Sequence, residues 1–157
     1  MTVKKIYKGK FLQIVEKEGH EIVSLNSAVA IIPEWENQVL LIKHYRPSIG
    51  NSLLELPAGW VEKGEREEET ALRELKEETG FISEELEFLV SFFPSPGYTS
   101  EKLSVFIARN LKKVEETNEI GELVFIPKTQ IKNLLKNKSI VDGKTLIGLM
   151  YYLDYKT

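Results

Sequence analysis

An acidic segment that contains three glycines, residues 59–81, constrains the fold of this chain more than any other stretch. It holds eight of the chain's 24 acidic residues. The pattern predicts a helix from about Arg66 to Thr79, because Gly80 is the residue type that most often ends a helix in the left-handed conformation. The rest of the chain is therefore expected to pack around a helix that is rich in carboxylates.

Two stripes of different chemistry run along the second half of this predicted helix. Residues three and four apart are neighbours on a helix surface, so Glu74, Glu77 and Glu78 share one narrow sector. The adjoining sector is apolar and holds Ala71, Leu72 and Leu75. Such a helix can bury one side and present three carboxylates to a cleft, which indicates a metal site.

Length and composition exclude several classes of function. The 157 residues are predicted to form a single domain, residues 1–157. Cysteine is absent, which excludes disulfides, zinc-thiolate sites and cysteine nucleophiles. A net charge of −3 gives no basic surface for a nucleic-acid polymer, and no segment is apolar for long enough to span a membrane. With no secretory signal visible, the expected location is cytoplasmic.

Strands are predicted on both sides of the acidic helix, and two further helices follow near the end of the chain. The run 38–45 is apolar throughout, as in a strand that is covered on both faces. A charged loop is expected at residues 112–121. The predicted strands are residues 4–7, 11–17, 21–26, 28–32, 38–45, 86–93, 103–108 and 123–126, with a short apolar piece at 53–56, and the predicted helices are residues 66–79, 127–136 and 143–155.

This order of elements predicts an α/β/α sandwich with a central mixed sheet and an N-terminal antiparallel strand region. The N-terminal region, residues 1–26, has a hairpin signature with a glycine turn at residues 18–20. Two or three strands do not make a stable core alone. These strands are therefore expected to pack on the body or on another subunit.

The spacing of Gly59, Glu65 and the run from Arg73 to Phe81 matches a known motif. Five residues separate Gly59 from Glu65, and seven separate Glu65 from Arg73. The 23-residue segment resembles the Nudix box at every fixed position. Chance agreement of its seven fixed letters is on the order of 10⁻⁷ per window for this composition. The one departure is Phe81, where the family more often has an aliphatic residue.

The resemblance extends to the ADP-ribose pyrophosphatase branch of the Nudix family. Residues 43–46, 54–59 and 95–101 look like segments of that branch, and Pro96 is its subfamily marker. The resemblance implies hydrolysis of ADP-ribose to AMP and ribose 5-phosphate by a homodimer whose N-terminal strands exchange across the interface. Two alternatives stay open, namely a broader range of nucleoside diphosphate sugars and a non-catalytic nucleotide sensor.

Pyrophosphate hydrolysis explains why the motif is acidic. Divalent metals neutralise charge on phosphoryl oxygens and lower the pKa of bound water, and Mg²⁺ prefers oxygen ligands. Glu74 and Glu78 lie one turn apart and can hold the same or adjacent ions, with Glu77 as a third member. The resemblance adds the backbone carbonyl of Ala58. The expected cofactor is Mg²⁺, with Mn²⁺ as an alternative and more than one ion bound.

Further site residues follow from the motif and from the resemblance. Arg73 is expected to orient the site, because its guanidinium fork suits a two-point contact with Glu65. The resemblance implies a general base in the loop before the last strand, where Glu119 is the candidate, with Glu116 and Glu115 behind it. It also implies substrate contacts from Arg46 near a phosphate or ribose, Glu55 near adenine, and Pro96, Tyr98 and Glu101 on the following loop.

Overall fold

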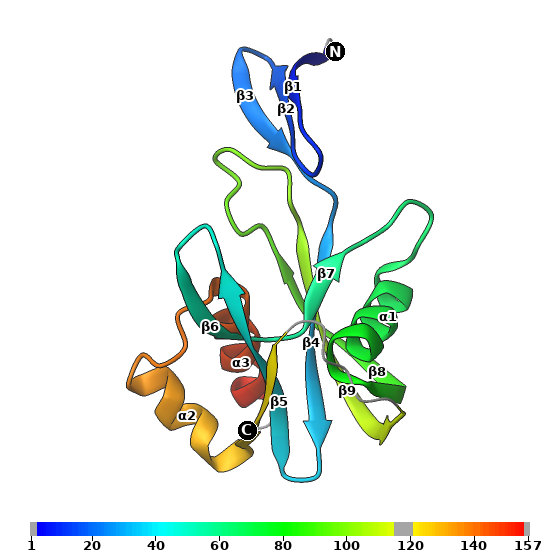
Figure 1. The fold of residues 1–157 in the computed structure, drawn as a ribbon, viewed down its shortest axis with the longest axis vertical. Helices are drawn as coiled ribbons and strands as arrows, with labels where there is room; N and C mark the ends of the chain where they lie inside the picture. The colour runs from blue at the N-terminus through cyan, green and yellow to red at the C-terminus, as the bar shows by residue number, and fades with distance from the viewer. Residues whose placement is uncertain (1–2, 115–120, 156–157) are drawn as a thin grey trace.

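A computed structural model describes residues 3–114 and 121–155 of the chain. Its elements follow the predicted order closely (Figure 1). The strands are β1 (Val3–Lys8), β2 (Gln13–Lys17), β3 (His20–Ser24), β4 (Ala28–Trp35), β5 (Gln38–Arg46), β6 (Asn51–Glu55), β7 (Ala58–Trp60), β8 (Phe81–Phe92), β9 (Leu103–Lys113) and β10 (Glu122–Pro127), and the helices are α1 (Glu67–Thr79), α2 (Lys128–Lys136) and α3 (Gly143–Tyr155).

The larger of the two sheets is mixed, as predicted. Its main path runs β10-β5-β4-β9-β8, with β6 paired to β5 and β7 paired to β4. Strands β4 and β9 run parallel, while the other pairs are antiparallel. The parallel pair at the centre needs cover on both faces.

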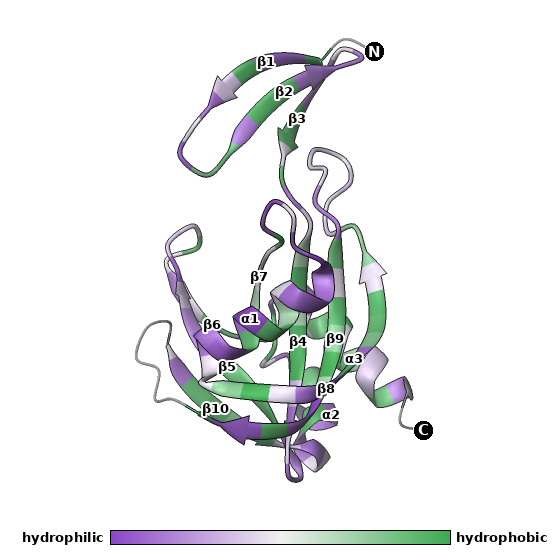
Figure 2. Ribbon diagram, turned by 90° about the vertical axis from the view of Figure 1, so that its right-hand side faces the viewer, coloured by the Kyte–Doolittle hydropathy of each residue, from purple (hydrophilic) through white to green (hydrophobic). Residues whose placement is uncertain are grey.

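Helices supply that cover on both sides of the sheet. Along β4, Val29 and Ile31 join the buried cluster that contains Leu75 of α1. The alternate residues of β4 point to the opposite face and join the cluster that contains Leu149 of α3. This period of two confirms the α/β/α sandwich. Figure 2 shows the apolar colour concentrated on β4 and β9, between the helices.

One edge of β4 is shared by two strands that diverge from each other. Residues 28–30 pair with β7, whereas Glu34 and Trp35 pair with β5. Between these two pairings the Ile31 N–H donates to the Pro57 carbonyl (2.9 Å). The turn that precedes Ala58 is therefore held against the middle of the central strand.

The three N-terminal strands form their own antiparallel sheet, β1-β2-β3, which stands apart from the body (Figures 1 and 2). The β2–β3 turn has positive φ at Glu18 (55°) and Gly19 (80°), which suits a tight hairpin. This finding confirms the predicted N-terminal antiparallel region. The sheet meets the body where the Val23 N–H donates to the Tyr98 carbonyl (2.8 Å).

Several predicted boundaries were wrong. Strand β8 begins at Phe81 rather than at residue 86, and β9 continues to Lys113 into the predicted charged loop. The extra residues include the buried Phe81 and Leu111, which join the cluster that contains Leu75, and the exposed ones are tied across the strands by the ion pair of Arg109 with Glu85. Burial of apolar side chains and cross-strand ion pairs both stabilise such an extension.

Strand β4 runs through Pro33 instead of ending before it. Pro33 faces the same edge as Ile31, because alternate residues of a strand point their N–H groups to the same side. On that edge the pairing with β5 starts only at Glu34, so the missing N–H of the proline breaks no ladder bond. Among the helices of the described residues, none has both the length and the apolar character needed to cross a membrane.

Candidate active site

Helix α1 is placed by capping at its ends and by one buried face. Arg66 is extended just before the helix, and its N–H donates to Glu69 Oε2 (3.0 Å), which is the half of a capping box that this sequence can form without a Ser, Thr, Asp or Asn cap. Gly80 ends the helix in the left-handed conformation (φ 71°), and its N–H donates to the Lys76 carbonyl (2.9 Å). Ala71 and Leu75 are fully buried against the sheet. The acidic stripe of the helix is thereby fixed relative to β7.

Two carboxylates of α1 lie against the turn at Ala58 and Gly59. Glu78 Oε2 accepts a hydrogen bond from the Ala58 N–H (2.9 Å). The carboxylate of Glu74 lies over Gly59 so closely that a Cβ at this position would come within 1.9 Å of Glu74 Oε1. The motif glycine is therefore required because the side chain of Glu74 fills the space beside it. This geometry brings together three of the predicted metal ligands.

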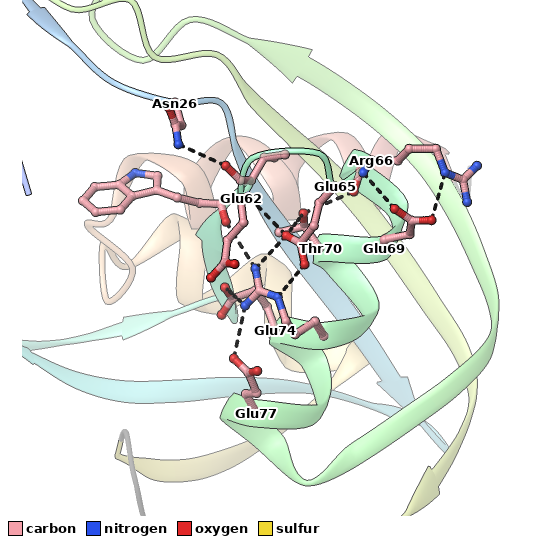
Figure 3. A network of polar contacts seen from close by, with 11 residues as sticks. Asn26, Glu62, Glu65, Arg66, Glu69, Thr70, Glu74 and Glu77 are labelled. Carbon is pink, nitrogen blue, oxygen red and sulfur yellow. Dashed lines mark hydrogen bonds and ion pairs between the residues drawn. The ribbon is translucent and has the colours of Figure 1, made fainter.

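Arg73 connects the loop before α1 to the acidic stripe, and Figure 3 labels its partners Glu65, Glu74 and Glu77. Its Nε and Nη2 donate to the two oxygens of Glu65 (2.9 and 3.0 Å), which is the expected two-point contact. Its Nη1 donates to Glu74 Oε1 (2.7 Å) and Glu77 Oε2 (3.2 Å), and its Nη2 also reaches the Trp60 carbonyl (3.3 Å). The hydrogen bonds from Arg73 lower the pKa of Glu65 to about 2. One guanidinium therefore orients three carboxylates, those of Glu65, Glu74 and Glu77.

The electrostatics of Glu74 and Glu78 suit a bound cation. Burial raises the pKa of Glu78 to about 7, and the nearby Glu74 adds to this while the Ala58 N–H opposes it. Burial also raises the pKa of Glu74, although Arg73 opposes the shift. Two part-buried carboxylates at close range favour a divalent cation that would neutralise both.

A preformed metal cage is not present: within residues 3–114 and 121–155, no three acidic or histidine side chains converge on one point. Glu74 and Glu77 instead accept from Arg73, and Glu78 accepts from the Ala58 N–H. The donor set of carboxylates and a nearby backbone turn nonetheless fits Mg²⁺, which binds through oxygen.

A cavity of about 650 Å³ adjoins this turn. Glu74, Ala58 and Gly59 form part of its lining, as do Arg46 and Glu101 among the predicted substrate residues. Trp60 lines it too, with its indole N–H donating to Glu101 Oε1 (3.2 Å). Apolar lining comes from Ala28, Phe92, Pro94, Leu103 and Ile147. The cavity thus joins the acidic stripe to an apolar region that can hold a base or a sugar.

Three predicted residues occupy other positions. Glu55 is buried beneath Arg46 and accepts from its Nε (2.7 Å) and Nη2 (2.6 Å). Pro96 and Tyr98 are not part of the cavity lining in the described structure. Tyr98 is exposed, and its backbone holds the N-terminal sheet. The candidate base Glu119, together with Glu115 and Glu116, lies outside the described residues.

The predicted start of α3 was correct, but sequence reasoning missed that this part of the chain contributes Asp142, Gly143 and Lys144 to the cavity lining. Lys144 donates to Glu55 Oε2 and to Asp142 Oδ2 (3.0 Å). The available signal was a helix-start pattern, in which Asp142 caps the helix by accepting from the Thr145 N–H (3.0 Å). That pattern predicts a helix but does not reveal what the helix approaches.

Comparison with known proteins identifies the family to which this fold belongs. The Nudix domain model matches residues 24–146, and the chain belongs to this family. It is 39% identical to a methanol dehydrogenase activator of Bacillus methanolicus and 35% identical to an ADP-ribose pyrophosphatase of Bacillus subtilis. Each alignment covers 83% of this chain and 74% of the relative. A crystal structure of an ADP compounds hydrolase has the same fold, with a TM-score of 0.85, 23% identity, and coverage of 99% of this chain and 91% of that chain.

Proposed function

We propose that this protein hydrolyses the pyrophosphate bond of ADP-ribose, with Mg²⁺, to give AMP and ribose 5-phosphate. The main observation behind the proposal is that Glu74 and Glu78 lie against the Ala58–Gly59 turn, which lines the cavity. The similarity to the protein of Bacillus subtilis named ADP-ribose pyrophosphatase supports the choice of substrate.

Each residue of the acidic stripe has a part in this proposal. Glu74, Glu78 and the carbonyl of Ala58 would hold a first Mg²⁺, and Glu77 would hold a second ion or contact the first through water. The bound metal would supply charge neutralisation on the pyrophosphate and a water of lowered pKa. Arg73 keeps Glu74 and Glu77 in place through its contacts to both. Mn²⁺ is expected to substitute for Mg²⁺, since it also prefers oxygen ligands.

The remaining lining of the cavity suits the two ends of a nucleotide sugar. Arg46 is partly exposed at the cavity and would face an anionic or ribose group. Trp60 and Phe92 offer aromatic surface for an apolar ring. Glu101 holds the Trp60 indole in place, so its part in substrate binding would be exerted through Trp60 as well as directly.

The whole chain is proposed to act as one catalytic unit that functions as a homodimer. Large apolar side chains are exposed on the N-terminal sheet and the turn that follows β1, namely Val3, Ile6, Tyr7, Phe11 and Leu12. Exposed apolar surface of this kind marks an interaction site. A second copy covering the sheet would bury it. The cytoplasmic location expected from the sequence stays a prediction.

The test is a substrate panel in which product release is measured with Mg²⁺ present. ADP-ribose, ADP-glucose, NADH, diadenosine polyphosphates and nucleoside triphosphates are compared by kcat/KM. The proposal predicts the highest kcat/KM for ADP-ribose, with AMP as the nucleotide product. Equal values for ADP-glucose would favour the broader nucleoside diphosphate sugar range. Tight binding of ADP-ribose without turnover would favour a nucleotide sensor and contradict the proposal.

A further inference from the structure

Lys144 is a part-buried cation that has no role in the hydrolysis proposed for this protein. It lies in the first turn of α3, lines the cavity, and has a side chain that is only 12% exposed. Its ammonium donates to Glu55 Oε2 and to Asp142 Oδ2 (3.0 Å). Removing an ammonium group from water is unfavourable unless it is paired, so these two carboxylates fix its position.

Glu55 is shared between Lys144 and Arg46. Its side chain is 2% exposed, and it accepts two hydrogen bonds from Arg46 and one from Lys144. Burial alone would raise the pKa of Glu55, but the hydrogen bonds from Arg46 and Lys144 outweigh burial and lower it to about 2. Arg46 and Lys144 together therefore keep the buried carboxylate of Glu55 ionised.

The same cluster fastens the start of α3 to the segment that leads into the metal-site turn. The Leu56 N–H donates to Thr145 Oγ1 (2.8 Å), and Thr145 Oγ1 donates to Asp142 Oδ2 (2.6 Å). Lys144 joins this network through both Asp142 and Glu55. The Glu55 side chain is thus held by Lys144 of α3 as well as by Arg46 of β5. The carboxylate that binds the Arg46 guanidinium therefore has a fixed position.

Arg46 has donor capacity left over. Its Nε and Nη2 are directed to Glu55, while its Nη1 takes part in no hydrogen bond between described residues. The side chain is 40% exposed and lines the cavity.

We propose that Lys144 is a positioning residue: by sharing Glu55 with Arg46, it holds the guanidinium where its Nη1 edge can bind the pyrophosphate of a nucleotide sugar. The inference rests on the proposed function for the identity of the bound group. The contact between Lys144 and Glu55 does not depend on it. Lys144 acts through Arg46 and does not itself take part in the chemistry.

The chain offers a matched control in Lys128. It is the first residue of α2, and its ammonium donates to Glu34 Oε2 (2.7 Å) on β4, in the same way that Lys144 at the start of α3 reaches Glu55 at the end of β6. Neither Lys128 nor Glu34 lines the cavity. Lys128→Met therefore removes a comparable helix-to-strand ion pair without touching the site.

The test is a double-mutant cycle with Lys144→Met, Arg46→Gln and the pair, measured as kcat and KM for ADP-ribose. Lys144→Met should raise KM at least about fivefold while kcat changes less than about twofold, as expected for lost substrate binding. Adding it to Arg46→Gln should change KM no further, because coupled residues are non-additive. Lys144→Arg should restore most of the affinity, and Lys128→Met should leave KM unchanged. Additive effects in the cycle, or an unchanged KM in Lys144→Met, would overturn the proposal.

A second readout separates this inference from the proposed function. In the substrate-free protein, exchange of the Arg46 Nε–H with solvent is followed by NMR, since that proton is held by Glu55. Lys144→Met should speed the exchange at least about tenfold, because Glu55 loses its tie to α3, whereas Lys128→Met should not. If the wild-type protein fails to hydrolyse ADP-ribose, the proposed function fails, and this exchange still decides the positioning role. Unaltered exchange in Lys144→Met would refute it.

Discussion

At Gly59 the site depends on the absence of a side chain. The carboxylate of Glu74 occupies the space where a Cβ would lie, at 1.9 Å from Oε1. We predict that Gly59→Ala displaces Glu74 and lowers kcat/KM steeply, while overpacking costs only about 1–3 kcal/mol in the free energy of unfolding. Kinetics and urea unfolding of the same variant check this. Wild-type kcat/KM in Gly59→Ala would show that Glu74 is not held in this position.

The buried Glu55 predicts how stability depends on pH. Its folded pKa of about 2 lies below the ordinary value of 4.5, so its ionised form stabilises the fold above pH 4.5, and this contribution is lost as the pH falls from 4.5 towards 2. Urea unfolding of the wild type and Glu55→Gln should differ by about 2 to 3 kcal/mol above pH 5. The difference should shrink towards pH 2. A gap of the same size at pH 2.5 and pH 7 would contradict the assignment.

At the scale of elements, α1 presents its carboxylates because its other side is anchored in the core. Leu75 is fully buried against the sheet, whereas Leu72, on the same helix, is 38% exposed. Leu75→Ala should lower the free energy of unfolding by about 2 to 5 kcal/mol. Leu72→Ala should lower it by about 0.5 kcal/mol or less. Chemical denaturation of both variants is the measurement, and equal losses would mean that the helix packs differently.

The elements also show what could be read from the sequence and what could not. Helix α1, its Gly80 cap and the Arg73–Glu65 contact depend on residues close together in the chain, and their spacing was enough to predict them. The contact between Lys144 and Glu55 joins residues 89 positions apart. No local pattern encodes such a pair, because it exists only once α3 has packed beside β6. The first residues of β8 were missed for a similar reason, since their partners lie on β9.

At the scale of the whole molecule, the N-terminal sheet predicts assembly. Ile6 and Phe11 are exposed apolar side chains in this part of the chain, which stands apart from the body in Figure 1. We predict a homodimer by light scattering, and the double substitution Ile6→Asp and Phe11→Asp should convert it to a monomer because charges cannot be buried unpaired at an interface. Met150→Glu, at an exposed apolar position on α3, should leave the dimer intact. A wild-type monomer would contradict the proposed assembly.

The central claim is that the acidic stripe of α1 holds Mg²⁺ for hydrolysis of ADP-ribose. The most direct measurement is the rate of AMP release at saturating Mg²⁺ for the wild type, Glu78→Gln and the control Glu68→Gln, an exposed carboxylate on the same helix. Glu78→Gln should lower kcat at least about 100-fold, because a bound metal contributes several kcal/mol and each 1.36 kcal/mol is tenfold in rate. Glu68→Gln should match the wild type. Unaltered turnover in Glu78→Gln would contradict the account.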